Sequence, residues 1–171
     1  MEKVKLYADP TPVGETFCEQ IPGPPLVQFE LSRGGIPRAS RVIDQLFENS
    51  RVGWADLLRD RTSEVLRREE EPDRFRFVVR LSRRGGTTAI EVRRRSPTDL
   101  WSHGHVVRNR TVECAFHHYS VRSEGTVGEL RDQVELRSTS RFFRFQRRQM
   151  GSVAARAAEN RLDDIVRELG Q

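Results

Sequence analysis

Two ionisable side chains fall on the apolar faces of predicted β-strands, where an unpaired charge is costly. Along residues 87–94 the alternating apolar positions end at Arg94, and along residues 127–137 they include Asp132. A buried charge is tolerated when it is paired or lines a wet cavity. A guanidinium offers several fixed N–H donors to a carbonyl or enolate oxygen, and a desolvated carboxylate can act as a general base. The sequence therefore predicts a pocket with Arg94 and Asp132 as catalytic candidates.

Both residues also have a simpler structural interpretation. Arg94 stands in the run Arg93-Arg94-Arg95, and a one-residue shift of strand register would exchange the residue that faces inward. All three arginines could equally lie on the surface. Asp132 could belong to a structural ion pair, with Arg94 or with a histidine, or turn outward at a bulge. The sequence leaves these alternatives open.

The histidines occur in close pairs, and one of them is a third catalytic candidate. Imidazole titrates near neutral pH and can transfer a proton. His118 alternates in step with Cys114 and Phe116, which gives its face the more apolar composition, so His118 is predicted to point inward. A satisfied core histidine is the alternative. His103 and His105 have His-x-His spacing, but no third ligand follows at a recognisable interval, so no metal site is predicted.

Aromatic side chains are the candidate walls of the pocket. They offer flat apolar surface to an aromatic ligand. The candidates are Trp54, Phe77, Trp101 and Phe116. Ordinary core packing is the alternative for each of them. Tyr119 follows His118 directly and is therefore expected on the opposite, outward face.

Composition indicates a single globular domain and excludes several classes of protein. The chain has 171 residues, of which 36% are hydrophobic and 32% charged. No apolar run is long enough to span a bilayer, and no basic-then-apolar leader opens the chain. The formal net charge is +5, but acidic residues are spread among the arginines, so codon bias and solvated strand faces are favoured over nucleic-acid binding.

Cysteine usage and missing motifs narrow the choice further. Cys18 and Cys114 have no metal-type spacing, so no disulfide framework is predicted and a reduced, cytoplasmic location is expected. Serine-hydrolase elbows, phosphate loops and dinucleotide fingerprints are absent from the sequence. No cofactor is predicted, and the oligomeric state is left open.

The elements that must position these residues follow from proline, glycine and hydrophobic periodicity. Residues 1–25 are proline-rich and are predicted to form an appendage to a domain over residues 26–171. A first strand is expected over residues 26–31. Pro37 suits the first turn of a helix, and residues 49–53 are expected to divide that region into two short helices.

The remainder of the chain predicts an antiparallel meander closed by a long helix. Short turns separate strands expected at residues 63–68, 74–82, 87–94, 101–108, 112–121 and 127–137. From Met150 to Leu169 apolar residues recur at steps of three or four, which is typical of an amphipathic helix. Phe142, Phe143 and Phe145 precede this helix and are expected to anchor its start in the core.

Several of these segments resemble the START-like, or helix-grip, superfamily, which includes the bacterial polyketide aromatase/cyclases. Val42–Leu58 resembles the family's helix pair with a tryptophan-centred turn, and Ser63–Phe77 resembles its second and third strands. Val92–Pro97 is similar to a strand end that carries an arginine shortly before a proline. Residues 130–136 and the long helix resemble the closing elements, so the resemblance covers residues 26–169.

This resemblance implies an α+β helix-grip fold, in which a curved antiparallel sheet wraps around the C-terminal helix and encloses a cavity. It also implies a cytoplasmic enzyme that closes a ring of a poly-β-ketone by aldol condensation. Arg94 would then stabilise the enolate, while Asp132 or His118 moves the proton. An acyl carrier protein would deliver the substrate, attracted by the positive net charge. The alternative is a non-catalytic binding protein for a lipid, quinone or polyketide.

Overall fold

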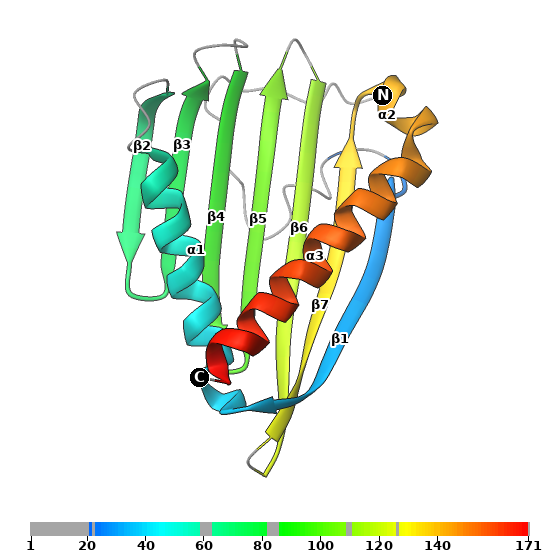
Figure 1. Cartoon of the computed structure of the whole chain (residues 1–171). Coiled ribbons are helices and arrows are strands. Elements are labelled where there is room, and N and C mark those ends of the chain that lie inside the picture. Colours follow the sequence, from blue (N-terminus) through cyan, green and yellow to red (C-terminus); the bar gives the residue numbers. More distant parts are fainter. Residues whose placement is uncertain are drawn as a thin grey trace.

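An antiparallel sheet of seven strands carries its helices on one face (Figure 1). The computed structural model describes residues 21, 23–58, 63–81, 86–108, 111–125 and 127–170. The strands are β1 (Val27–Pro37), β2 (Ser63–Glu71), β3 (Arg74–Leu81), β4 (Gly86–Ser96), β5 (Asp99–Arg108), β6 (Thr111–Glu124) and β7 (Val127–Ser138). Their order is β1-β7-β6-β5-β4-β3-β2, so β2 to β7 form the predicted meander and β1 returns beside β7. The predicted helix-grip architecture is confirmed.

The two faces of the sheet differ in chemistry, as the alternation in β3 predicts. Phe75 and Phe77 are buried beneath the helices. Arg74 and Arg76, at the alternate positions, lie on the outer face together with the buried Glu91. Because successive side chains of a strand point to opposite faces, one strand supplies both the core and an ionic surface.

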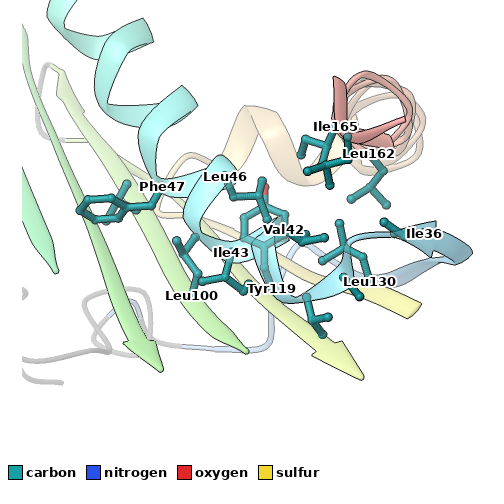
Figure 2. Packing of buried hydrophobic residues seen from close by; sticks show 14 of the residues in the cluster. Ile36, Val42, Ile43, Leu46, Phe47, Leu100, Tyr119, Leu130, Leu162 and Ile165 are labelled. Carbon is teal, nitrogen blue, oxygen red and sulfur yellow. The ribbon is translucent and has the colours of Figure 1, made fainter. Parts of the chain in front are cut away.

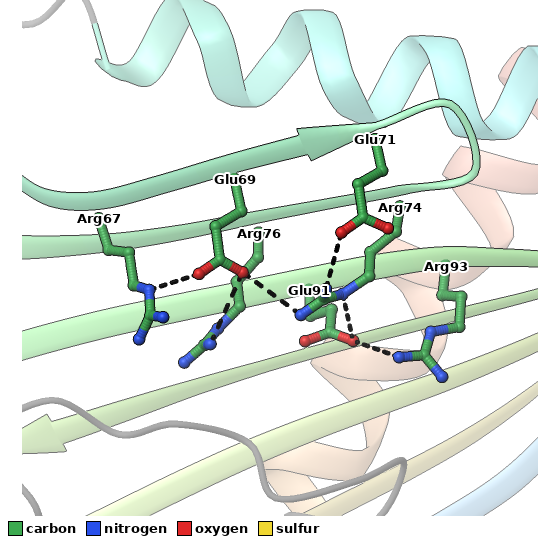
Figure 3. Close-up of polar contacts among 7 residues, drawn as sticks. All are labelled: Arg67, Glu69, Glu71, Arg74, Arg76, Glu91 and Arg93. Carbon is green, nitrogen blue, oxygen red and sulfur yellow. Dashed lines mark hydrogen bonds and ion pairs between the residues drawn. The ribbon is translucent and has the colours of Figure 1, made fainter.

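Charges on the outer face neutralise one another across β2, β3 and β4 (Figure 3). Arg74 Nε lies 3.2 Å from Glu91 Oε1, and Arg93 Nη2 lies 3.4 Å from the same oxygen. Glu69 Oε2 lies 3.4 Å from Arg74 and 4.0 Å from Arg76. This pairing allows Arg76 and Glu91 to be buried, because a charge removed from water needs an opposite charge beside it.

Helix α1 (Val42–Leu58) follows a short 3₁₀ turn at Ala39–Arg41 and packs against the concave face. Its buried residues Val42, Ile43, Leu46 and Phe47 form one stripe, which Figure 2 shows directed toward Leu100 and Tyr119. The expected break at residues 49–53 does not occur, so one helix replaces the two short ones. Gly53 within a helix costs only about 1 kcal/mol, and no proline interrupts the hydrogen-bonded ladder.

Helix α3 (Arg147–Leu169) crosses the same face over the strands that close the sheet (Figure 1). Its C-terminal half is the buried half, through Ala158, Leu162, Ile165 and Leu169. Leu162 and Ile165 join the core shared with α1 and Tyr119 (Figure 2). In the part of the chain that the structure describes, no helix is long and apolar enough to cross a membrane.

The start of α3 differs from the expectation that phenylalanines anchor it in the core. Phe142, Phe143 and Phe145 form a separate short helix, α2 (Arg141–Phe145), and none of them is fully buried. Phe142 is 62% exposed and Phe145 is 90% exposed. The predicted anchor is therefore wrong. The chain turns at Gln146 before α3 begins, so the aromatic rings stay outside the core.

Most of the predicted appendage, residues 1–25, lies outside the described residues, so its role stays a prediction. Ile21 is described and packs against Val112 and Cys114 on the outer face. Arg137 Nη1 donates hydrogen bonds to the carbonyl oxygens of Ile21, at 3.2 Å, and Gly23, at 2.7 Å. Cys114 is disulfide-bonded, which contradicts the expectation of a reduced thiol. The cytoplasmic location therefore stays a prediction without support from cysteine chemistry.

Candidate functional site

A cavity of ≈740 Å³ lies between the concave face of the sheet and helices α1 and α3. Its floor carries small side chains on the central strands, at Ser102, Gly104 and Ala115. Gly104 pairs with Ile90 on β4 and with Ala115 on β6, so the reduction in bulk falls at adjacent positions. Small residues at inward positions of neighbouring strands leave space that larger ones would fill. This signal is present in the sequence and was missed.

His117 lines the cavity and is held from the sheet by Asp132. The Asp132 side chain is 0% exposed, and its Oδ2 and Oδ1 lie 3.1 and 3.2 Å from His117 Nδ1. His117 stands opposite Val134, so Asp132 is its diagonal neighbour on β7. A carboxylate at Nδ1 favours the tautomer that carries its proton there. The other ring nitrogen, Nε2, then has a lone pair for a ligand.

Tyr119 and Arg161 extend this pair into a polar cluster of four residues. The rings of Tyr119 and His117 are stacked, with centroids 5.7 Å apart and an interplanar angle of 9°. Arg161 Nη1 on α3 donates a hydrogen bond to the Tyr119 hydroxyl at 3.0 Å, and Arg161 also lines the cavity. Tyr119 is buried and faces inward, so its predicted outward position is wrong. The cluster places a cation and an imidazole on the cavity wall, with a buried phenol beside them.

Burial gives Tyr119 a measurable signature at high pH. Desolvation, with the negative charge of Asp132 added, raises the pKa of Tyr119 to about 12. The unfolded chain loses this proton near the ordinary pKa of about 10. Its contribution to stability is therefore complete below pH 10 and should disappear as pH rises to about 12. Urea unfolding at increasing pH should show this decline in the wild type and a smaller decline in Tyr119→Phe; equal declines would contradict the assignment.

His118 lies on the outer face of the sheet, away from the cavity. Its Nε2 is 2.7 Å from Asp99 Oδ2, and its ring centroid is 5.3 Å from that of Trp101. Trp101 in turn meets Phe116 edge to face, with centroids 5.1 Å apart. The predicted inward orientation of His118, Trp101 and Phe116 is therefore wrong. On β6 the inward position belongs to His117, and on β5 it belongs to Ser102, which pairs with His117. Their placement gives no support to the catalytic or substrate-binding roles predicted for them.

The error has a physical cause in the apolar content of the outer face. Cys114 and Phe116, which suggested an inward face, instead pack with Val112 under Ile21. In this protein an apolar strand face can therefore be the outer face, where it packs against Ile21, and not only the face that forms the main core. The true inward face of β6 carries Ala115 and His117, which line the cavity. These residues are small or polar, so this face looks less apolar in the sequence than the outer face does.

Arg94 faces the helices as predicted, but it lies at the end of the sheet and does not line the cavity with His117. Arg94 Nε donates to Asp73 Oδ1 at 2.8 Å, and Nη1 donates to Asp44 on α1. Its guanidinium also sits over the Phe47 ring, 5.6 Å from the centroid. These contacts raise the pKa of Arg94. Through these contacts the Arg94 side chain connects α1 to the turn between β2 and β3.

Removal of this link should weaken the fold and leave the cavity intact. Arg94→Gln loses both ion pairs, and we expect the free energy of unfolding to fall by about 1 kcal/mol because the pairs are partly exposed. High salt should reduce the difference. Arg80→Gln is a matched control, since Arg80 lies at the surface and, among the described residues, pairs with Glu64. Chemical denaturation measures the effect, and an unchanged midpoint for Arg94→Gln would contradict the structural assignment.

Two further residues, Phe77 and Trp54, were predicted to form the cavity wall. Phe77 faces inward and is fully buried in the main core beside Phe75, with ring centroids 5.5 Å apart. The Trp54 side chain lies outside the described residues. Among the residues that the structure describes, no group of three or more His, Cys, Asp or Glu side chains is arranged to hold a metal ion.

A second cavity of ≈310 Å³ continues along the sheet from the first. The two share Gly104 and Ala115 as lining residues. Leu26, Leu136 and Met150 give the second cavity a mainly apolar wall. A ligand can therefore place a polar group at His117 and extend an apolar part toward the start of α3.

Comparison with known proteins supports the fold. No family model matches the chain, and no curated protein matches it. The Zhui aromatase/cyclase of a Streptomyces species is similar in structure with a TM-score of 0.57 and 12% identity, over 84% of this chain and 93% of that one. A conserved protein of Geobacillus kaustophilus gives 0.56 and 10%, over 84% and 95%. A START superfamily protein of Mycobacterium smegmatis gives 0.41 and 11%, over 81% and 98%. The similarity to the first two structures shows that the chain has the helix-grip fold.

Proposed function

We propose that this protein is an aromatase/cyclase-like enzyme that closes a ring of a poly-β-ketone by aldol condensation in the main cavity. The observation that carries the proposal is the His117–Asp132 pair, in which a fully buried carboxylate holds an imidazole at the cavity wall. Similarity to the Streptomyces aromatase/cyclase adds weight, but it concerns the fold, and activity must be argued from the site.

The pair can supply the proton transfer that the reaction needs. His117 Nε2 takes a proton from a methylene between two carbonyl groups, and Asp132 stabilises the imidazolium that forms. The resulting enolate carbon attacks a second carbonyl carbon of the same chain. The new alkoxide receives the proton back from His117, and later loss of water leads toward the aromatic ring.

We assign to Arg161 the stabilisation of the negative charge that develops on the enolate or alkoxide oxygen. Its guanidinium lines the cavity beside His117 and donates to Tyr119 through Nη1. A guanidinium has five N–H donors, so others remain for an enolate or alkoxide oxygen. In this proposal Arg161 takes the role that the sequence suggested for Arg94, whose donors are engaged by Asp44 and Asp73.

A non-catalytic carrier of a hydrophobic molecule is the second candidate. The apolar second cavity favours it, because tight binding of an extended apolar group needs no chemistry. The two candidates differ in what happens to a bound poly-β-ketone. A carrier releases it unchanged, whereas a cyclase alters the pattern of ring closure.

Reconstitution with a minimal polyketide synthase tests the choice. Adding the wild-type protein should convert a mixture of spontaneous cyclisation products into one dominant product, identified by mass spectrometry and NMR. An unchanged mixture would contradict the enzyme. Native mass spectrometry of the same samples then tests the carrier, which predicts a bound, unmodified polyketide mass on the protein.

A further inference from the structure

The segment formed by α2 and the first half of α3 carries a surface that the proposed chemistry does not use. Phe142 and Phe145, one helical turn apart, are 62% and 90% exposed, and Val153 on α3 is 65% exposed. Exposed apolar side chains that gather in one region and are surrounded by polar residues are typical of an interaction surface. Figure 1 shows α2 at the end of the sheet opposite the C-terminus. We call the exposed residues of 141–156 the α2 surface.

Charge on the α2 surface has a single sign. Residues 136–158 contain no aspartate or glutamate. The exposed arginines of the surface are Arg141, Arg144, Arg147, Arg148 and Arg156. Among the described residues, none of these five side chains has an ion pair. Several described arginines on other surfaces are paired, as Arg94 is with Asp44 and Asp73.

The second half of α3 has the opposite character. Glu159, Asp163, Asp164 and Glu168 follow within it, and Arg167 pairs with Asp164 at 3.0 Å. The helix is therefore basic and apolar at one end, and acidic or mixed at the other. This division leaves the positive charge of the helix at the end where the exposed phenylalanines lie.

We propose that the α2 surface binds the face of a lipid bilayer that carries anionic phospholipids. Phenylalanine side chains enter the boundary between headgroups and acyl chains, while arginines remain at the level of the phosphates. Each arginine near such a surface contributes through the negative surface potential. The exposed aromatic rings project from a short helix, so they suit a deformable bilayer better than a folded partner of fixed shape.

The α2 surface lies close to the second cavity. Met150 lies within the same segment and lines the second cavity. Docking of α2 on a bilayer would therefore bring the apolar end of the cavity toward the lipid. A hydrophobic ligand could pass between them without crossing water. Binding to lipid does not depend on the cyclase chemistry, so either proposal can fail alone.

Vesicle flotation with the full-length protein tests this inference. Vesicles of phosphatidylcholine with about 30% phosphatidylserine should bind the protein, and pure phosphatidylcholine should bind it far less. Raising the salt from about 0.1 to about 0.5 M should weaken the binding. Equal binding to both vesicle types, or no binding to either, would overturn the proposal.

Matched variants locate the contact on the molecule. Arg144→Glu and Arg148→Glu should each weaken vesicle binding about fivefold or more, and Phe145→Ala about tenfold. Arg167→Glu makes the same charge change near the other end of α3, and Val52→Ala truncates another exposed apolar residue; both should bind as the wild type does. Equal losses in the controls would overturn the assignment. So would capture of a purified acyl carrier protein through Arg144 and Arg148 without vesicle binding.

Discussion

Replacing His117 with glutamine should lower the rate of ring closure about 10²–10⁴-fold, the range expected when a general base is removed. Glutamine keeps polar atoms near Asp132 but cannot take a proton at neutral pH. The measurement is the yield of the dominant cyclised product in a reconstituted polyketide synthase at fixed enzyme concentration. Spontaneous products should replace it in proportion.

His118→Gln is the matched control for this prediction. The same substitution at the adjacent residue changes a side chain on the outer face, where His118 contacts Asp99. The cyclisation rate should be that of the wild type. A large loss in His118→Gln with full activity in His117→Gln would contradict the assignment of the base. Urea unfolding of both variants shows whether any loss of activity reflects loss of the fold.

The second large effect is on stability and concerns the packing of α3 against the sheet. Leu162→Ala should reduce the free energy of unfolding by about 2–5 kcal/mol, because a fully buried leucine leaves a cavity when truncated. Leu162 packs in the cluster that joins Leu130 and Tyr119 on the sheet with α1 (Figure 2). Urea denaturation followed by circular dichroism measures the change.

Val153→Ala supplies the comparison on the same helix. Val153 lies in the exposed half of α3, so its truncation should change stability by no more than about 0.5 kcal/mol. Similar losses in Leu162→Ala and Val153→Ala would contradict the placement of α3. A loss confined to Leu162 would agree with a helix whose C-terminal half alone is fixed to the core.

The fold could be predicted from the sequence because its elements depend on local periodicity. Alternation in residues 74–81 and the long repeat from Met150 to Leu169 identify a strand and a helix with little tertiary context. The aromatic start of α3 was predicted wrongly for the same reason. Periodicity does not show that the chain turns at Gln146 and leaves Phe145 outside the core.

The site was harder to predict because faces and partners are decided by residues distant in sequence. Ile21 covers the outer face of β6, so the apolar alternation around His118 pointed to the wrong face. The inward direction of Arg94 was predicted correctly, but its contact with Asp44, fifty residues away, was beyond local reasoning. Asp132 was recognised by its cost on an apolar face, and the structure gives it His117 as a partner.

Hydrogen–deuterium exchange at an activated methylene tests the central claim most directly, because it isolates proton abstraction from carrier delivery and ring closure. A β-keto thioester would be incubated in D₂O with each protein and followed by NMR. Wild type and His118→Gln should accelerate exchange over buffer, and His117→Gln should not. Exchange that is no faster with the wild type than in buffer, or that survives in His117→Gln, would contradict the assignment of His117 as the base.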